Sequence, residues 1–475
     1  MGILLFIISF ADVIELVDLW RSNRRDDNAL PNQVDGGGEP RVSIHIPICS
    51  EPPEVVINSL DAIALLHYRN YEVIVVDNNT SDERLWFPIK DYCASNGSRY
   101  RFFHLSTWPG YKAGALNFAL AKTVEDAEIV AVLDADYAVD PNYLNTLTSY
   151  FSDPTVKFVQ APQAYRLPNR PTLHTLLISW EYWQFFVVGM QLRAKRNAIM
   201  LHGTMVLVRK SALEAVCGWS EWCVTDDSET GIRLLSSGGR AVYVPMPYGR
   251  GLTPFTHEDF LLQRRRWVIG GAQQLRMHWK ELIAGKLARK DSQLTIGQRL
   301  HFFQGWVAWI RDALLVLAWL TFMTGSAILI LAPGGVIQLS ILSYGVLMAV
   351  GLSFLRHFIV YRYYLRRSIV GSLAMTGFVL GMTRAIGMAW INGMVPGAKP
   401  FFKTPKRRHT SGRNSFPYTD SVILFFTSIF LLITEVTSLG IAVVFCFLLV
   451  TFCSAGTSVL AVLKLSASSS DYTIP

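Results

Sequence analysis

Short apolar runs alternate with helical stretches over the first third of the chain. Three of these runs are rich in β-branched residues: "RVSIHIP" (41–47), "YEVIVVDNN" (71–79) and "EIVAVLDADY" (128–137). Strands that alternate with helices, such as residues 112–125, predict a parallel sheet with helices on both faces. Ligands of such sheets bind beyond the carboxyl ends of the strands. Asp77, Asp134 and Asp136 lie at those ends, which makes them candidate site residues.

A different pattern begins near residue 172. The segment "LLISWEYWQFFVVGMQLRAKR" (176–196) combines bulky apolar side chains with a basic end, which is typical of a helix at a membrane surface. An ordinary core helix is the alternative. The segment from Arg264 to Trp279 has the same character. We therefore expect interfacial helices in this part of the chain.

Long uncharged blocks follow in the second half. Residues 313–332 and 336–355 are each 20 residues without a charge, the length that crosses about 30 Å of hydrocarbon. The whole composition agrees, since 51% of the residues are hydrophobic and only 17% are charged. These features predict a membrane protein.

The basic residues between the apolar blocks indicate a topology. Residues 361–367 contain three arginines, and residues 396–418 contain six lysines and arginines. If both loops are cytoplasmic, residues 368–395, which include Arg384, form an in-plane helix instead of a span. We then expect four spans and a cytoplasmic tail, with these approximate bounds: 312–332, 336–357, 420–437 and 441–463 for the spans, and 466–475 for the tail.

The N-terminal 27 residues combine an apolar stretch with regularly spaced acidic residues. Residues 3–10 are apolar, but Asp12, Glu15 and Asp18 recur every three residues and would share one helical face. A basic leading region and a small-residue cleavage site are missing, which argues against a signal peptide. We expect a membrane-associated or packed helix at residues 1–27, a linker at 28–40, a catalytic domain at 41–285 and a membrane bundle at 286–465.

Charge and cysteine content exclude two classes of function. The net charge of +8 gathers beside apolar segments, so it follows the positive-inside rule and does not indicate nucleic-acid binding. The six cysteines form no CxxC pair, and neither a zinc site nor a disulfide framework is expected.

Three clusters carry candidate chemistry. Asp134 and Asp136 can both reach one site and hold a divalent metal, although an acidic turn that caps the next helix fits them equally well. Asp226 and Asp227 precede a helix; such a carboxylate can act as a general base, or simply cap the helix. In "QRRRW" (263–267), Gln263, Arg266 and Trp267 share one helical face, while Arg264 and Arg265 are expected to point elsewhere.

The shared face of Gln263, Arg266 and Trp267 suits a diphosphate and a sugar, because guanidinium binds phosphate oxygens and indole covers the apolar face of a pyranose. The alternative is a basic membrane-surface helix with an interfacial tryptophan.

The clusters occur in one order that resembles a known family. Asp77, the Asp134/Asp136 pair, "TDD" (225–227) and "QRRRW" resemble the D, DxD, TED, QxxRW series of processive family 2 glycosyltransferases, the group of cellulose, chitin, curdlan and hyaluronan synthases. Three more segments are similar to elements of that family: "YKAGALNFAL" (111–120) to KAGxLN, "MLHGTMVLVRKSAL" (200–213) to the strand beside the acceptor, and "FFKTPK" (401–406) to the FxVTxK gating loop. The resemblance covers roughly residues 40–465.

The resemblance implies an α/β GT-A-type (Rossmann-like) cytosolic domain with interfacial helices and an α-helical transmembrane bundle. It also implies residue roles. Asp77, Lys112, Gln263 and Arg266 would bind the UDP-sugar, and Asp134 and Asp136 would bind it through Mg²⁺ or Mn²⁺. Asp227 would be the catalytic base. Trp267, His202 and Asp226 would contact the acceptor, and Phe401, Thr404 and Lys406, in the gating-like loop 396–418, would close over the nucleotide.

Three positions depart from the family pattern. Asp226 replaces a glutamate, Lys403 replaces the valine of the gating loop, and His202 stands where cellulose synthases carry a cysteine. These departures leave the acceptor and the linkage more open than the reaction.

The expected activity is inverting polymerisation of a β-glucan from UDP-glucose, with extrusion through the protein's own channel in the plasma (inner) membrane. The partners would be the UDP-sugar, the growing polysaccharide and the bilayer, with accessory export proteins possible and no nucleic acid. One alternative is a polymer synthase that uses UDP-N-acetylglucosamine. Two others are a non-processive enzyme that makes a glycolipid and an inactive transporter or scaffold.

Overall fold

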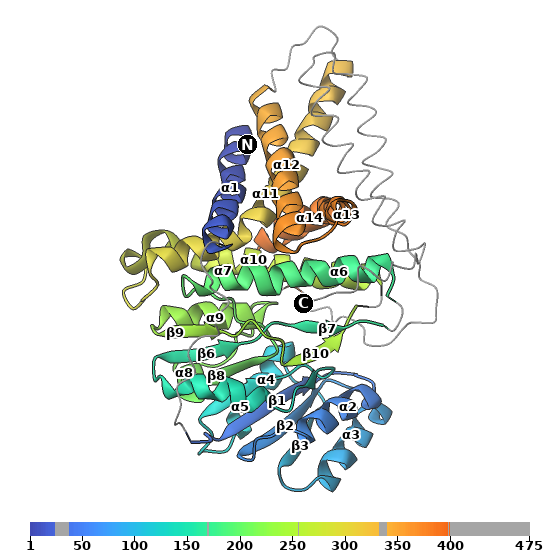
Figure 1. Ribbon diagram of the computed structural model, residues 1–475, viewed down its shortest axis with the longest axis vertical. Coiled ribbons are helices and arrows are strands. Elements are labelled where there is room, and N and C mark those ends of the chain that lie inside the picture. Colours follow the sequence, from blue (N-terminus) through green and yellow to red (C-terminus); the bar gives the residue numbers. More distant parts are fainter. Residues whose placement is uncertain (24–37, 169–170, 255, 332–339, 398, 400–475) are drawn as a thin grey trace.

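The computed structural model describes residues 1–23, 38–168, 171–254, 256–331, 340–397 and 399. Most of the predicted linker, the gating-like loop from residue 400 onward, the two expected spans at 420–437 and 441–463 and the C-terminal tail lie outside these residues. Within them the chain forms three layers, which are an α/β domain, a middle layer of helices and a helical bundle (Figure 1).

The α/β domain is built on a seven-stranded sheet with the order β3-β2-β1-β4-β8-β6-β9. Its strands, in chain order, are β1 (Val42–Ile48), β2 (Tyr71–Asn78), β3 (Tyr100–Leu105), β4 (Ile129–Val132), β6 (Val156–Gln160), β8 (Val206–Arg209) and β9 (Arg240–Tyr243). Neighbouring strands are parallel except at β8, which is antiparallel to both β4 and β6. The sheet is therefore mixed, and not parallel throughout as predicted. A long segment leaves the sheet at the sheet's carboxyl edge, and the chain then re-enters the sheet as β8.

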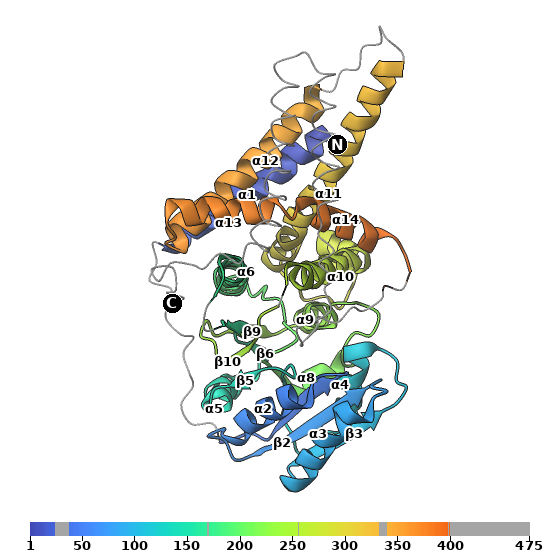
Figure 2. The same cartoon turned by 90° about the vertical axis from the view of Figure 1, so that its right-hand side faces the viewer.

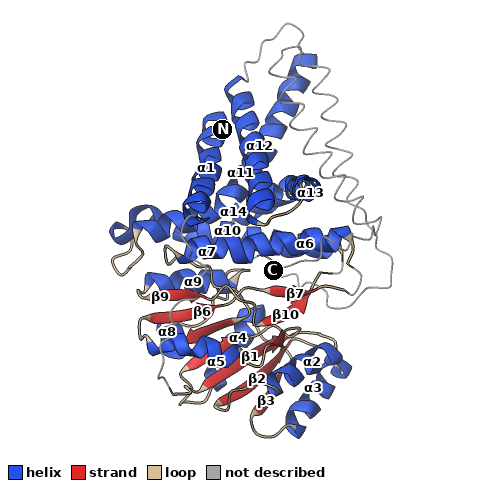
Figure 3. Cartoon of the chain, viewed as in Figure 1, coloured by secondary structure: helices blue, strands red, loops and turns tan. Residues whose placement is uncertain are grey.

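Helices cover both faces of this sheet, as predicted, and Figure 3 shows the arrangement. All eight residues of β2 are buried, since its alternate side chains face different helices. Val73 and Val75 pack with α2 (Pro53–Ala64), whereas Ile74 and Val76 pack with α4 (Tyr111–Lys122). The other helices of the domain are α3 (Glu83–Ser95), α5 (Tyr143–Thr148), α8 (Lys210–Ala215) and α9 (Asp226–Ser236).

A small three-stranded sheet lies beside the carboxyl ends of the main strands. It has the order β5-β10-β7, and its strands are β5 (Ala138–Val139), β7 (Ala164–Arg166) and β10 (Gly249–Leu252). These segments are too short and too mixed in composition for a periodic pattern to reveal them. They position the loops that follow β4 and β6.

The middle layer lies between the sheet and the bundle. It consists of α6 (Leu173–Trp183), the π-helical turn η2 (Gln184–Gly189), α7 (Met190–Ala194) and α10 (His257–Ala284) (Figure 1). A capping box starts α10, in which Thr256 and Asp259 satisfy each other's backbone N–H groups. The two segments that were predicted to be interfacial helices therefore both belong to this layer.

The bundle contains α1 (Gly2–Asn23), α11 (Ile296–Leu331) and α12 (Ser340–Ile359), which run side by side away from the sheet (Figures 1 and 2). After the turn η4 (Val360–Tyr364), α13 (Ile369–Leu380) and α14 (Thr383–Met394) lie across these helices at the base of the bundle. Three segments of the described chain are long and apolar enough to cross a membrane: Ile296–Phe322, Leu342–Tyr364 and Ile369–Met394. The last one is broken between α13 and α14, and whether it lies in the membrane plane stays a prediction.

Candidate active site

A cavity of about 380 Å³ opens at the carboxyl ends of the central strands. We call it the carboxylate cavity, because Asp134, Asp136 and Asp227 all line it. Lys112, Gln263, Arg266 and Trp267 line it as well. The fold thus brings together residues that lie as much as 155 positions apart in the sequence, between Lys112 and Trp267.

Asp134 and Asp136 each have one carboxylate oxygen held by a neighbour. Lys112 Nζ donates to Asp134 Oδ1 at 2.5 Å and to the carbonyl of Gly203 at 2.7 Å. The backbone N–H of Leu252, on β10, donates to Asp136 Oδ2 at 2.7 Å. These contacts fix both side chains at the wall of the cavity.

The two carboxylates suit a divalent cation that a substrate completes. Mg²⁺ in nucleotide sites is commonly held by one or two carboxylates together with phosphate oxygens. Among the described residues no group of three or more His, Cys, Asp or Glu side chains could hold a metal alone. The residues present therefore fit a metal that binds with a diphosphate, and not a closed structural site.

Asp77 lies behind the cavity wall. It is the penultimate residue of β2, and its carboxylate accepts a hydrogen bond from Thr80 Oγ1 at 2.5 Å and pairs with His104 Nδ1 at 2.6 Å. Only 1% of Asp77 is exposed, and the next residues, Asn78 and Asn79, line the cavity in its place. Its part in substrate binding stays a prediction.

Asp226 and Asp227 begin α9; Asp226 is buried, and Asp227 is half-buried. Burial, and after it the charge of Asp227, raises the pKa of Asp226 to about 7, and burial also raises the pKa of Asp227. Asp227 Oδ1 accepts from the N–H of Ser228 at 2.7 Å. Asp226 lines neither the carboxylate cavity nor a smaller cavity beside it, which is described below. Its Oδ2 has no hydrogen-bond partner among the described residues. Asp227 is the member of the pair that reaches the cavity.

Arg266 lies within electrostatic reach of three carboxylates. Burial lowers the pKa of its guanidinium, and the charges of Asp134, Asp227 and Asp226 oppose that effect. Gln263, one turn earlier on α10, accepts a hydrogen bond from the hydroxyl of Tyr182. The predicted shared face of Gln263, Arg266 and Trp267 is therefore present in the structure, since all three line the carboxylate cavity.

Arg264 does not point away from this group, contrary to the expectation from helical spacing. Its guanidinium forms an ion pair with Glu181 of α6 and lies 4.0 Å from the centre of the Trp267 ring. Tyr182, Phe260 and Phe185 surround it at 4.8, 5.0 and 5.8 Å. Residues three apart on a helix are neighbours, so the sequence contained the signal, but the buried partner Glu181 lies 83 positions away.

A second, smaller cavity of about 60 Å³ adjoins the first. We call it the aromatic cavity, because Phe185, Phe186, Trp267 and Trp309 line it. His202 lines it too; burial, and after it the charge of Arg193, lowers its pKa to about 3, so the ring is neutral. Neither of its nitrogens has a hydrogen-bond partner among the described residues. An uncharged imidazole in this position can bind hydroxyl groups.

Two glycines after Trp267 let α10 approach its neighbours closely. A Cβ at Gly270 would lie 2.0 Å from Thr225 Oγ1, and a Cβ at Gly271 would lie 2.6 Å from the ring of Trp309. Gln274 Nε2 then donates to Thr225 Oγ1 at 2.8 Å. The small residues that follow "QRRRW" therefore hold α10 against the start of α9, which carries Asp227.

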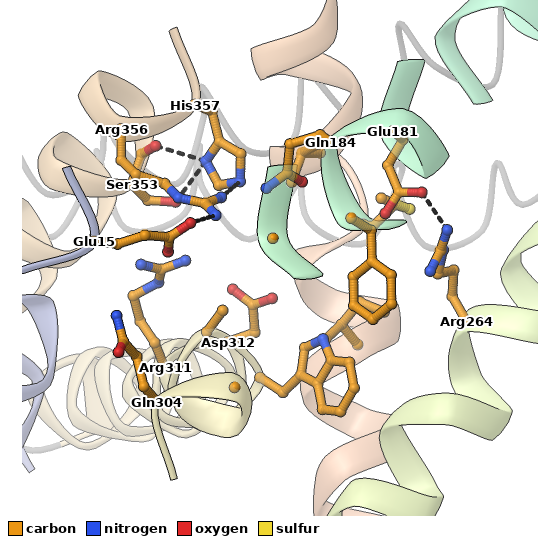
Figure 4. A pocket seen from close by; sticks show the side chains of 18 of the residues that line it. Glu15, Glu181, Gln184, Arg264, Gln304, Arg311, Asp312, Ser353, Arg356 and His357 are labelled. Carbon is orange, nitrogen blue, oxygen red and sulfur yellow. Dashed lines mark hydrogen bonds and ion pairs between the residues drawn. The ribbon is translucent and has the colours of Figure 1, made fainter. Parts of the chain in front are cut away.

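A third cavity, of about 180 Å³, lies on the bundle side (Figure 4). This bundle cavity is lined by charged and polar side chains of α1, α11 and α12, including Glu15, Arg311, Asp312 and Arg356. Figure 4 shows Glu15 paired with Arg356, and the atoms are 2.5 Å apart. Arg311 pairs with Asp12. The carboxylate stripe predicted on the N-terminal helix therefore faces the bundle.

The three cavities share their walls. Asp227, Trp267 and Gln163 line both the carboxylate and the aromatic cavity, and Phe185 and Trp309 line both the aromatic and the bundle cavity. Gln163 could not be identified from the sequence, because it lies in an irregular segment between β6 and β7 where no motif marks it. The arrangement can hold a charged diphosphate at one end and a flat, hydroxyl-rich group beside Trp267.

Part of the chain matches a known protein family. Residues 40–270 match the family described as "Glycosyltransferase like family 2". The chain is 28% identical over 294 residues to the cellulose synthase catalytic subunit [UDP-forming] of Xanthomonas axonopodis pv. citri, with 60% of this chain and 38% of that protein covered. It is 26% identical over 336 residues to glucomannan 4-beta-mannosyltransferase 1 of Cyamopsis tetragonoloba, with 68% and 62% covered. Each match spans less than two thirds of the relative.

Among solved structures, the chain is similar to the mannosyltransferase PcManGT from Pyrobaculum calidifontis, determined in complex with GDP-Man and Mn²⁺. The TM-score is 0.55 at 19% sequence identity, and the match covers 83% of this chain and 98% of that one. The two proteins share a fold.

Proposed function

We propose that this chain, whose residues 40–270 match the family described as "Glycosyltransferase like family 2" and whose fold is similar to that of a solved mannosyltransferase, is a processive polymerase embedded in the membrane by its apolar helices. The chain would build a β-glucan from UDP-glucose by inverting transfer and extrude it through its own bundle. The observation that carries the proposal is the row of three adjoining cavities from Asp134 and Asp136 to the membrane helices.

Asp227 is the proposed base. It takes the proton of the acceptor hydroxyl, whose oxygen attacks the anomeric carbon of the donor sugar. The bond from that carbon to the diphosphate oxygen breaks, and UDP leaves with the bonding electrons. The raised pKa of Asp227 suits this role, because a base is most effective when its pKa lies near the working pH.

The basic residues of the carboxylate cavity are placed to bind the leaving UDP and to order the wall on which it rests. Arg266 is placed to pair with diphosphate oxygens as negative charge develops on them. Lys112 bridges Asp134 and Gly203 and so orders the wall on which the nucleotide rests. Asp134 and Asp136 would hold a divalent cation. When bound, the cation would neutralise the negative charge of the diphosphate.

Trp267 is the proposed acceptor platform. An indole suits the apolar face of a pyranose, and the neutral ring of His202 lies in the same small cavity. Beyond them, Phe185 and Trp309 form the boundary with the polar bundle cavity. A hydroxyl-rich chain needs such a path, because it cannot dissolve in hydrocarbon.

An incorporation assay with three nucleotide sugars identifies which of them the protein uses as its donor. The purified protein in lipid nanodiscs is given labelled UDP-glucose, GDP-mannose or UDP-N-acetylglucosamine, and the product is sized and digested with linkage-specific enzymes. A high-mass polymer from UDP-glucose supports the proposal. A mannan from GDP-mannose is the second candidate, favoured by the similarity to glucomannan mannosyltransferases. A product that stays a single-sugar glycolipid would overturn processivity.

Asp227→Asn tests the mechanism in the same assay. It should reduce incorporation by about 10³-fold or more, while the exposed Asp91→Asn on α3 leaves it unchanged. Full activity of Asp227→Asn would require another base.

A further inference from the structure

Gln163 lies at the same junction between two cavities as Asp227 and Trp267, the two residues most central to the proposed reaction. Of the described residues that line the carboxylate and aromatic cavities, only Gln163, Asp227 and Trp267 line both. A residue at this junction lies beside the bond that forms, because the donor sugar occupies one cavity and the acceptor the other. The same hexose then becomes the acceptor end after transfer, still next to Gln163.

The backbone around Gln163 is fixed on both sides. The N–H of Ala161 donates to the carbonyl of Met205 at 3.0 Å, immediately after β6. Ala164 begins β7 and pairs with Arg250 of β10. Only two residues, Pro162 and Gln163, lie between these anchored points, so the backbone has little conformational freedom and the position of the Gln163 side chain is fixed.

The side-chain amide is also oriented. The hydroxyl of Tyr165 donates to Gln163 Oε1 at 3.0 Å. The carboxamide nitrogen carries two N–H donors, and among the described residues the Gln163 side chain makes no other hydrogen bond. The nitrogen is therefore left to donate to a group that enters the junction.

Tyr165 is held in turn by two of its neighbours. Its ring stacks on Tyr182 with centres 4.2 Å apart, and Tyr137 meets it edge-on at 6.5 Å. Tyr182 donates to Gln263 of α10, and Tyr137 follows Asp136 in the sequence. The amide of Gln163 is thus positioned from two sides, by the loop that carries Asp136 and by the helix that carries Trp267.

We propose that Gln163 is a specificity-determining residue, whose Nε2 donates a hydrogen bond to one hydroxyl of the hexose being transferred. A site built to bond a hydroxyl discriminates strongly against an analogue that lacks it, because a buried donor is then left unpaired. The inference rests on the proposed function, since it concerns the sugar of that reaction.

The test pairs variants with deoxy donors. The wild type and Gln163→Leu are compared with UDP-glucose and with its 2-, 3-, 4- and 6-deoxy derivatives, and kcat/KM is measured for each. Gln163→Leu should reduce kcat/KM about ten- to hundredfold with UDP-glucose. With one deoxy donor the variant and the wild type should be equally active, and with the other three the full reduction should remain.

Three controls keep the outcomes distinct. Gln293→Leu, at an exposed glutamine, should change nothing, and Tyr165→Phe, which releases Gln163 Oε1, should give a weaker loss with the same pattern. UDP affinity within twofold of the wild type establishes that the Gln163→Leu site is folded. An equal loss with all five donors, or no loss, overturns the inference alone. A wild type that incorporates no hexose from any donor overturns the proposed function, and with it the role of Gln163.

Discussion

The guanidinium carbon of Arg264 lies 4.0 Å from the centre of the Trp267 ring, one helical turn further along α10. Arg264 is only 5% exposed, and its charge is balanced by Glu181 of α6. The pair therefore connects two helices of the middle layer directly behind the proposed acceptor platform.

Replacing Arg264 alone should destabilise the protein more than replacing the pair. Arg264→Met leaves the Glu181 carboxylate buried without a counter-charge, at an expected cost of about 3 kcal/mol. Glu181→Met combined with Arg264→Met should recover most of that loss, since apolar side chains replace both charges. Thermal unfolding in detergent measures the difference. Equal unfolding temperatures for the single and double variants would contradict it.

The pH dependence of activity should follow the Asp226/Asp227 pair. Both pKa values are raised, and that of Asp226 is about 7. Because a base acts only when it is deprotonated, kcat/KM should rise as the pH increases through the raised pKa of Asp227 and level off above it. The titration belongs to the pair and not to one residue. A pH–rate profile from 5 to 9 measures this.

Asp226→Asn is the matched variant for that profile. It removes a neighbouring negative charge, so the rise in kcat/KM should shift to lower pH. The folded pKa of Asp226 exceeds its unfolded value, so the folded state binds more protons and stability falls as the pH rises between the two values. Asp226→Asn should abolish that part of the fall. A profile that stays in place would contradict the coupling.

Gly270 tests the close contact of α10 with α9. A Cβ at this position would lie 2.0 Å from Thr225 Oγ1, and a helix cannot accept that contact without moving. Gly270→Ala should therefore lower both the unfolding temperature and kcat. At Gly351, a helical glycine of α12, a Cβ would meet nothing within 4 Å, and Gly351→Ala should stabilise slightly. Similar effects of the two variants would contradict the packing argument.

Much of the α/β domain could be predicted because its strands are short β-branched runs that are buried on both faces. Strand ends placed Asp134 and Asp136 at the carboxyl edge of the sheet, and helical spacing placed Gln263, Arg266 and Trp267 on one face of a helix. The expectation that both groups share one cavity came from the resemblance to family 2 glycosyltransferases. The antiparallel direction of β8 did not, since periodicity carries no information on the direction of a strand. Gln163 and the Arg264–Glu181 pair also could not be predicted, because each depends on a contact that only the tertiary fold creates.

In the N-terminal helix, the local spacing of residues indicated a face of the helix but not what that face contacts. The spacing of Asp12, Glu15 and Asp18 correctly indicated one carboxylate face. It did not identify the partners, because Arg311 and Arg356 lie 299 and 341 positions later. Long-range pairs of this kind leave no mark in the local pattern.

Removing divalent metal should abolish transfer without unfolding the protein. Only Asp134 and Asp136 would hold the cation from the protein side, so it contributes to nucleotide binding more than to the fold. Treatment with EDTA should stop incorporation, and Mg²⁺ or Mn²⁺ should restore it, while the unfolding temperature changes little. Asp136→Asn should raise the metal concentration needed for half-maximal activity. Undiminished activity after chelation would contradict a metal at this site.

The ion pair between Asp12 and Arg311 should hold α1 against the bundle. Both side chains are at least nine-tenths buried, with 9% and 3% exposed, and removing one partner leaves a buried charge uncompensated. We predict that Asp12→Leu increases hydrogen exchange at the amides of α1, while exchange in the main sheet is unchanged. Asp18 is the control, because it lies on the same face and forms no ion pair with any described residue; Asp18→Leu should have a small effect. If Asp12→Leu and Asp18→Leu give equal exchange, the ion pair does not anchor α1.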